Sequence, residues 1–237
     1  MSTPVLCLPF AGAGASFFHP WCRLGVPGVE VVPVQLPGRE RRLAEPPYRD
    51  VHEAADGLLP GVLASVSGAE KVALFGHSLG AVLAYELARR LSAEGAVPVA
   101  RLFVSGSPGP WTQRERRATG LDDDAFLARV KEFAGYRHEA FDEPEMRELL
   151  LPTLRADVEM HENYRPVSRE PIAVPVTAIR GGDDTLVTAG DVAQWREATR
   201  LDFATAELPG GHMYLTDGAR PLLELIAGSL EATALCV

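Results

Sequence analysis

The sequence predicts an α/β fold in which a mainly parallel central sheet is covered by helices on both faces. Two observations support this prediction. Six short apolar runs, typical of buried strands, alternate with longer amphipathic stretches that are typical of helices. Strands and helices in this order imply crossover connections, which place parallel strands side by side and helices above and below them.

In chain order, residues 5–8 form a compact apolar run that is followed at once by a glycine-rich turn at residues 10–14. Residues 29–36 form a second strand candidate, which Pro33 weakens because proline has no N–H to donate to a neighbouring strand. The remaining strand candidates are residues 71–75, 101–105, 174–179 and 202–208. The helix candidates are residues 51–67, 80–94, 190–198 and 221–232.

One long stretch, residues 111–169, breaks the alternation because it contains no strand-like run. A connection between consecutive elements usually takes only about 2–6 residues. This stretch instead contains three helix candidates, at residues 122–133, 144–155 and 156–164. We therefore predict a single domain over residues 1–237, with residues 111–169 forming an inserted helical subdomain that acts as a lid.

Composition and charge limit the classes of partner. The chain of 237 residues carries 23 basic and 32 acidic side chains, a net charge of −9. This balance argues against a nucleic acid partner, because phosphate binding needs a positive surface. Three cysteines are too few and too scattered for a disulfide framework or a zinc site. The uncharged run at residues 2–22 is interrupted by proline and glycine, so we expect no signal peptide or membrane anchor and a cytoplasmic protein.

The strongest local signal is the pentapeptide Gly76-His77-Ser78-Leu79-Gly80, which lies directly between a strand candidate and a helix candidate. A G-x-S-x-G nucleophile elbow requires this context, which disfavours a chance match. Side chains in place of the two glycines would collide with the neighbouring strand and helix. Ser78 would then present its hydroxyl as a nucleophile at the end of the strand. The N–H groups that open the following helix would favour a developing negative charge there.

A serine hydroxyl needs an adjacent base to act as a nucleophile near neutral pH. Of six histidines, His212 follows the last strand candidate and precedes the last helix candidate. This position matches the order Ser, Asp/Glu, His that accompanies nucleophile elbows. His77 is too close to Ser78 in sequence to fold back on it, and we expect it to pack beside the elbow. His161 could face the substrate from a lid helix, but we expect it, like the remaining three, in a surface or packing position.

The carboxylate that orients the base should follow the strand candidate at residues 174–179, where two aspartates, Asp183 and Asp184, are adjacent. The spacing Gly-x-x-Asp-x-x-Val, counted from Gly181 to Val187, favours Asp184. Asp184 would accept the imidazole N–H of His212 and fix its tautomer. Asp183 would then form a turn, as aspartates after glycines often do, but it stays open as the alternative.

An oxyanion hole needs two backbone N–H donors, and one should come from Leu79, the residue after the nucleophile. The other should come from the loop after the first strand, with Ala11 as first choice and Phe10 as second, because small residues let the backbone approach a carbonyl oxygen. Phe10 and Met213 are the candidate substrate contacts. A phosphate-binding loop is the competing interpretation, but the spacing is not G-x-G-x-x-G and no Lys-Ser/Thr follows.

Three segments carry a resemblance to a known family. They are Leu8-Pro-Phe-Ala-Gly-Ala-Gly14, Gln35-Leu-Pro-Gly-Arg-Glu-Arg-Arg42 and Glu45-Pro-Pro47. Together with the elbow, they make nearly the whole chain resemble the type II thioesterases of polyketide and nonribosomal peptide assembly lines, within the α/β-hydrolase superfamily. Many relatives have Ala-Gly-Gly where this loop reads Ala-Gly-Ala-Gly, a change that leaves the oxyanion assignment intact.

The resemblance implies a discrete cytoplasmic editing enzyme that hydrolyses stalled or aberrant acyl groups from the phosphopantetheine arm of acyl or peptidyl carrier proteins. It implies Ser78 as nucleophile, His212 as base and Asp184 as its partner, with an acyl-serine intermediate and no metal or cofactor. We expect a monomer.

Two further expectations concern the substrate. Apolar side chains of the inserted helices could line an acyl chamber or simply pack the lid onto the core; they are Phe126, Phe133, Phe141, Leu149, Leu150 and Leu151. Two basic clusters could attract an acidic carrier protein; they are Arg39, Arg41 and Arg42, and Arg114, Arg116 and Arg117. Alternatively, Arg39 forms an ion pair with Glu40.

Two other functions remain open. A carboxylesterase or lipase acting on free oxyesters would use the same triad, although the Leu-Pro-Gly-Arg-Glu segment favours the thioesterase. A non-catalytic binding protein built on this fold would be expected to have a broken triad, whereas all three members are present.

Overall fold

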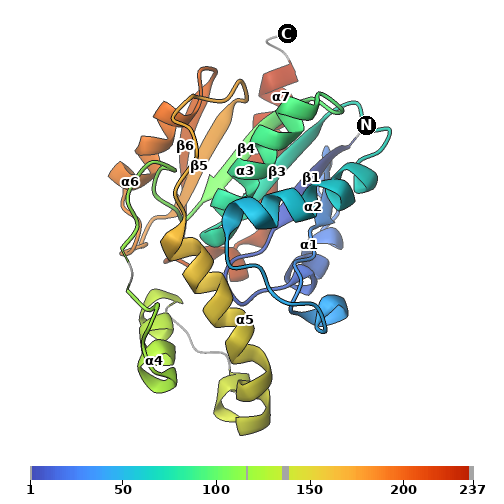
Figure 1. Cartoon of the computed structure of the whole chain (residues 1–237). Coiled ribbons are helices and arrows are strands. Elements are labelled where there is room, and N and C mark those ends of the chain that lie inside the picture. Colours follow the sequence, from blue (N-terminus) through green and yellow to red (C-terminus); the bar gives the residue numbers. More distant parts are fainter. Residues whose placement is uncertain (1, 116, 135–138, 235–237) are drawn as a thin grey trace.

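Six strands form one sheet in the computed structural model of the protein, which describes residues 2–115, 117–134 and 139–234. The strands lie in the order β2-β1-β3-β4-β5-β6, and every neighbouring pair is parallel, as predicted (Figure 1). They are β1 (Thr3–Leu8), β2 (Val29–Pro33), β3 (Val72–His77), β4 (Val99–Ser105), β5 (Val176–Gly181) and β6 (Phe203–Leu208). β2 ends at Pro33, earlier than predicted, because proline cannot donate to the neighbouring strand.

Helices cover both faces of the sheet. The helices of the described residues are α1 (His19–Cys22), α2 (Val51–Ser65), α3 (Leu79–Glu94), α4 (Asp123–Ala134), α5 (Pro144–Asn163), α6 (Ala189–Ala193) and α7 (Ala219–Ala234). α2 and α3 pack on one face, and α1 and α7 pack on the other (Figure 1). The helix predicted at residues 190–198 is divided, since a 3₁₀ helix (Gln194–Ala198) follows α6.

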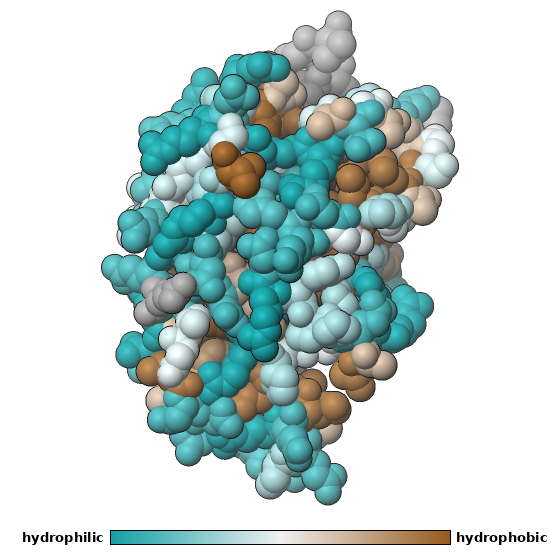
Figure 2. Space-filling view, in the orientation of Figure 1, coloured by the Kyte–Doolittle hydropathy of each residue, from teal (hydrophilic) through white to brown (hydrophobic). Residues whose placement is uncertain are grey.

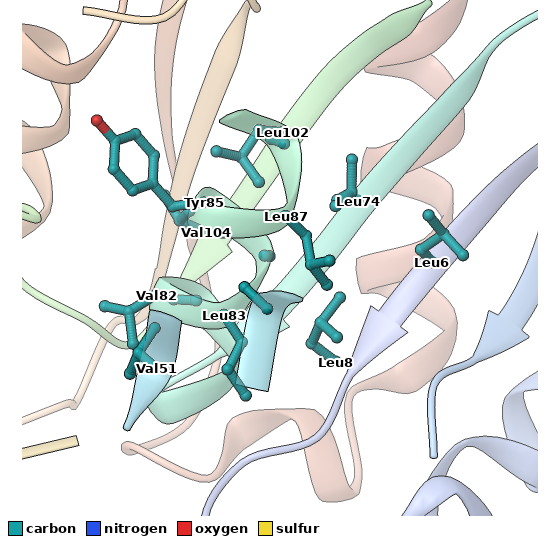
Figure 3. Packing of buried hydrophobic residues seen from close by; sticks show 14 of the residues in the cluster. Leu6, Leu8, Val51, Leu74, Val82, Leu83, Tyr85, Leu87, Leu102 and Val104 are labelled. Atoms are coloured by element: carbon teal, nitrogen blue, oxygen red, sulfur yellow. The ribbon is translucent and has the colours of Figure 1, made fainter. Parts of the chain in front are cut away.

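Alternation along the strands divides the core into two layers. Leu6 and Leu8 of β1 pack with Leu87 of α3 on one face of the sheet (Figure 3). Val5 and Cys7 point to the opposite face, which α7 covers, because successive side chains of a strand alternate. These five side chains are fully buried. The sheet is therefore tightly packed on both faces. In open parallel sheets of this kind, ligands bind beyond the carboxyl ends of the strands.

The insertion between β4 and β5 contains α4 and α5 (Figure 1). α5 is one continuous helix, so the prediction of two helices, at residues 144–155 and 156–164, is wrong about a break. Pro152 lies inside α5 and removes one backbone hydrogen bond. Leu151 and Leu154 on either side of it are buried in an apolar cluster with Phe126 of α4. This packing offsets the lost hydrogen bond, so the helix continues past the proline.

Apolar side chains are exposed at the far end of the insertion. Figure 2 shows hydrophobic residues in the lower part of the molecule, where α4 and α5 lie in Figure 1. Met146 and Leu149 of α5 are 40% and 46% exposed. Among the helices of the described part, none combines the length and hydropathy that a bilayer crossing would require.

Candidate active site

Ser78 occupies a sharp turn between the end of β3 and the start of α3. Its backbone has φ 53° and ψ −115°, a conformation that costs a non-glycine residue about 1–3 kcal/mol. A Cβ on Gly76 would lie 1.9 Å from the carbonyl oxygen of Gly80, and a Cβ on Gly80 would lie 2.3 Å from that of Leu8. The turn therefore requires glycine on both sides, and it has the strand-turn-helix form of a nucleophile elbow.

His212 is held by Asp184. Nδ1 of His212 donates to Oδ2 of Asp184 at 2.8 Å, and Oδ1 accepts the backbone N–H groups of Leu186 at 2.8 Å and Val187 at 3.1 Å. Asp184 is buried, whereas Asp183 is exposed. The structure thus brings Asp184, the carboxylate that the spacing favours, to the imidazole.

These contacts keep Asp184 ionised. Burial raises the pKa of its carboxyl group, but the hydrogen bond and charge of His212 and the two backbone N–H groups outweigh burial and hold the pKa below its usual value. An ionised Asp184 fixes the proton of His212 on Nδ1, so Nε2 is the nitrogen that can accept a proton.

Ser78 and His212 line the same cavity, which has a volume of about 360 Å³. Gly106, directly after β4, allows the loop that carries His212 to come close, because a Cβ on Gly106 would lie 3.1 Å from Cε1 of His212. The Ser78 hydroxyl has no hydrogen-bond partner in the part of the chain that the structure describes, so its contact with His212 is not formed here. Bonds between nucleophile and base are often long without substrate and tighten when it binds.

Of the two backbone N–H groups expected in an oxyanion hole, one belongs to a residue that lines this cavity and the other to the residue after Ser78. Leu79 opens α3, and Ala11 follows β1 and lines the cavity. Within the described ranges, neither N–H has a hydrogen-bond acceptor, so both can bind a ligand oxygen. Phe10 and Met213, the predicted substrate contacts, also line the cavity.

Comparison with known proteins identifies the family. Residues 3–230 match the family model described as "Thioesterase domain". The chain belongs to the thioesterase family. It is 36% identical over 229 residues to the thioesterase PikA5 of Streptomyces venezuelae, an alignment that covers 97% of this chain and 81% of that protein.

Solved structures agree with this assignment. The type II thioesterase BorB from the borrelidin biosynthetic cluster is 35% identical with a TM-score of 0.83, covering 98% of this chain and 92% of that one. YbtT, the type II thioesterase from the Yersiniabactin NRPS/PKS biosynthetic pathway, is 30% identical with a TM-score of 0.88, covering 98% and 94%. The resemblance drawn from the sequence is confirmed, and with it the α/β-hydrolase fold and thioester hydrolysis.

In this thioesterase a buried ion pair fixes the loop that carries Ala11. Arg39 donates to both carboxylate oxygens of Asp157 on α5, at 2.6 and 2.7 Å. Arg39 also donates to the carbonyl of Ala13 at 3.0 Å, and Asp157 accepts the N–H of Gly12 at 2.8 Å. Three segments are therefore joined at one point: the loop after β1, the Leu-Pro-Gly-Arg segment and α5.

The ion pair corrects the expectation for Arg39 as a member of a docking surface. Arg39 is only 6% exposed, and in the described structure it does not pair with Glu40, which accepts the N–H of Ser16 at 3.1 Å. Arg114 is also buried, and Arg116 lies outside the described residues. Arg41 and Arg117 are exposed, and they stay candidates for a docking surface. A run of charges in the sequence looks the same whether each side chain is solvated or, like Arg39, paired with a distant carboxylate.

Replacing Arg39 by alanine should lower the free energy of unfolding by about 3–5 kcal/mol, because it leaves the buried carboxylate of Asp157 without a counter-charge. Urea unfolding followed by circular dichroism measures this loss. Arg42→Ala is the matched control, since its ion pair with Glu45 lies at the surface and should contribute much less to stability. Equal losses in the two variants would contradict the prediction.

The insertion forms part of the cavity wall, but through residues other than those expected. Val130 of α4 and Leu154 and Val158 of α5 line the cavity. Phe126 and Leu151, which were candidates, share an apolar cluster with Leu154 and Val158 but do not line the cavity. Of the other candidates, Phe141 packs against that cluster, Leu149 is exposed, Leu150 is half-buried, and the side chain of Phe133 lies outside the described residues.

Two residues of the site were not predicted. Asp157 has no recognisable motif around it, so no signal in the sequence marks it. His161 lines the cavity, the alternative that we considered but did not favour, and its spacing from Leu154 and Val158 could have indicated that all three share one helix face. Among the described residues, no group of three or more His, Cys, Asp or Glu side chains is placed to hold a metal ion.

His77 is buried beside the elbow, as expected. Its Nδ1 is hydrogen-bonded to the Ser105 hydroxyl at 2.9 Å, and that hydroxyl lies 2.7 Å from the hydroxyl of Tyr214. Burial lowers the pKa of His77 well below its usual value, and the charges of His212 and His161 lower it further. The imidazole of His77 is therefore neutral in the folded thioesterase.

We expect mild acid to destabilise the protein through His77. Above about pH 6.5 the imidazole is neutral in both the folded and the unfolded chain, whereas below that value only the unfolded chain takes up the proton. Stability is therefore lost as the pH falls, by up to about 1.4 kcal/mol per pH unit. Urea unfolding at pH 7, 6 and 5 should show a shallower loss for His77→Asn than for the wild type; identical slopes would refute this.

Proposed function

We propose that this thioesterase removes stalled or aberrant acyl groups from the phosphopantetheine thioesters of acyl or peptidyl carrier proteins. The observation that carries the proposal is the cavity shared by Ser78, on its strained turn, and His212, bound to Asp184 at 2.8 Å. The biosynthetic clusters of BorB and YbtT support the same class of pathway for this chain.

In the first half of the reaction, Oγ of Ser78 attacks the thioester carbonyl carbon while Nε2 of His212 takes the hydroxyl proton. Asp184 stabilises the imidazolium through its hydrogen bond to Nδ1. The N–H groups of Leu79 and Ala11 bind the carbonyl oxygen as it becomes an anion. The C–S bond then breaks, His212 gives its proton to the departing thiol, and the acyl group remains as an ester of Ser78.

In the second half, a water molecule takes the place of the thiol. His212 accepts one proton of the water as its oxygen attacks the acyl-serine carbonyl, and the same two N–H groups stabilise the new oxyanion. The ester bond breaks, His212 returns the proton to Ser78, and the free acid leaves. One water molecule is consumed in each cycle.

The remaining parts of the proposal concern the insertion and the setting of the enzyme. Residues 111–169 act as the lid, in which Val130, Leu154 and Val158 offer an apolar wall to the acyl chain; Phe10 and Met213 line the same cavity. We place the enzyme in the cytoplasm, as the resemblance to type II thioesterases implies, and we expect a monomer.

The test compares carrier-bound thioesters with matched oxyesters. Carrier proteins loaded with acyl-phosphopantetheine groups of increasing length are incubated with the wild-type enzyme, and intact-protein mass spectrometry follows the loss of the acyl mass. We expect deacylation of the carriers, and slower hydrolysis of oxyesters of the same acyl groups. Hydrolysis of the oxyesters alone would indicate a carboxylesterase. Hydrolysis of neither, with no labelling of Ser78 by a fluorophosphonate, would indicate a binding protein.

A further inference from the structure

One buried cation in the cavity wall, Arg114, takes no part in the proposed hydrolysis. It is 8% exposed. Its Nη2 donates to the hydroxyl of Ser107 at 3.2 Å and to the carbonyl of Pro108 at 3.4 Å, and its guanidinium lies over the ring of Tyr164 at 5.0 Å. Within the described part of the chain, Nε and Nη1 have no partner. The ring of Tyr164 offsets part of the cost of burying the charge of Arg114. It accepts no hydrogen bond from the N–H groups that lie in the plane of the guanidinium.

The carboxylates that line the cavity do not neutralise this cation. Glu162 accepts the backbone N–H groups of residues 117–119, Glu115 pairs with Arg117 at 2.9 Å, and Asp191 binds both the N–H and the hydroxyl of Thr188. No ion pair within 4.0 Å joins any of them to Arg114 in the described residues. A buried charge without a counter-charge is costly, so a ligand that supplies one would be bound strongly.

Arg114 nevertheless stays charged at neutral pH. Burial lowers its pKa to about 10, Tyr164 opposes this change, and the charge of Arg165 adds to it. A guanidinium of this kind is suited to a carboxylate, which it binds through charge-assisted hydrogen bonds.

His161 is a second polar side chain of the cavity wall that lacks a partner. Its Nε2 is buried and has no hydrogen bond within the described part of the chain. Burial lowers the pKa of His161 well below its usual value, and the charges of Arg114 and His212 lower it further. Arg114, His161 and His212 line the same cavity, and the neutral ring of His161 can donate one hydrogen bond to an oxygen bound there.

We propose that Arg114, together with His161 in the same cavity wall, binds a carboxylate on the acyl group, so that the enzyme favours thioesters of dicarboxylic acids over those of simple alkanoic acids. This inference rests on the hydrolase function proposed above. Arg114 lines the same cavity as Ser78, and it binds Ser107, two residues beyond Ser105, whose carbonyl accepts the N–H of Ser78 at 2.8 Å. A carboxylate on the acyl group is therefore the source that the experiment tests against the phosphate of the carrier arm. The phosphate of the carrier arm lies at the far end of the arm from the thioester.

The experiment compares glutaryl with pentanoyl thioesters, which have the same chain length. Both are prepared on N-acetylcysteamine, which lacks a phosphate, and on coenzyme A, which has one. For the wild type we expect a higher kcat/KM for glutaryl than for pentanoyl on both carriers. In Arg114→Gln the ratio of the two kcat/KM values should fall by about 10-fold or more, and Arg114→Lys should restore part of it. Arg129→Gln, an exposed arginine of α4, is the control and should leave the ratio unchanged.

The other outcomes each overturn a different statement. A wild type that prefers pentanoyl, or an Arg114→Gln variant whose ratio is unchanged, refutes the carboxylate site while hydrolysis itself stands. A loss confined to the coenzyme A thioesters assigns Arg114 to the phosphate of the arm. A wild type that hydrolyses none of the four thioesters, and no acyl carrier, refutes the proposed function. The wild-type preference needs no variant, so the proposal is tested even where Arg114→Gln fails to fold.

Discussion

Replacing Ser78 by alanine should abolish turnover of acyl thioesters and leave the fold intact. Without the hydroxyl, no acyl-enzyme can form, and His212 has only water to activate against the thioester. We expect kcat to fall by about 10³- to 10⁶-fold, the range found when the nucleophile of a triad is removed. Steady-state assays measure the fall, and mass spectrometry of the acid-quenched enzyme should find an acyl adduct on the wild type and none on the variant.

The control for this prediction is Ser65→Ala. Ser65 lies at the end of α2, and its hydroxyl donates to the carbonyl of Val62 at 2.8 Å, so its loss should leave kcat unchanged. Circular dichroism establishes that both variants are folded. If Ser78→Ala were folded and still turned over at a rate close to that of the wild type, Ser78 could not be the nucleophile.

Replacing Asp184 by asparagine should lower kcat by about 10⁴-fold, with a much smaller change in KM. The asparagine amide can donate to Nδ1 of His212, which moves the imidazole proton to Nε2. That tautomer cannot accept the proton of Ser78. Because the wild-type carboxyl has a lowered pKa, it is ionised at neutral pH, and the variant removes this charge as well as the acceptor.

Asp183→Asn is the matched control, since it makes the same chemical change one residue away. Asp183 is exposed, and its backbone N–H, which the substitution retains, donates to the carbonyl of Gly210 at 2.9 Å. We expect kcat to stay within about twofold of the wild type. The reverse pattern, with Asp183→Asn inactive and Asp184→Asn active, would exchange the roles of the two aspartates.

Features of the fold that depend on local sequence could be predicted. The strand before Ser78 and the helix after it are visible as an apolar run and an amphipathic run, and Gly76 and Gly80 are required by the turn itself. The structure places Asp184 beside His212, as the spacing from Gly181 indicates, because a short loop after a strand leaves few ways to direct a side chain.

Contacts between distant segments could not be predicted. Arg39 and Asp157 are 118 positions apart, and neither segment signals the other. The choice of cavity-lining residues also depends on how the insertion docks on the sheet. Periodicity identifies an apolar face of α5, but it does not say whether that face meets α4, as Leu151 does, or the cavity, as Val158 does.

The attachment of Asp157 to the loop after β1 limits how the enzyme can be re-engineered for bulkier substrates. Leu154 and Val158, the obvious positions to shorten, belong to the same turns of α5 as Asp157, and a Cβ added to Gly12 would lie 3.0 Å from Leu154. Trimming them would enlarge the available space and also loosen the loop that carries Ala11, the residue whose amide we propose as an oxyanion donor, so we expect gains in scope to come with losses in rate. Val130 packs against the same apolar cluster, but it lies on α4 rather than on the helix that holds Asp157, so it should be the better first position to shorten.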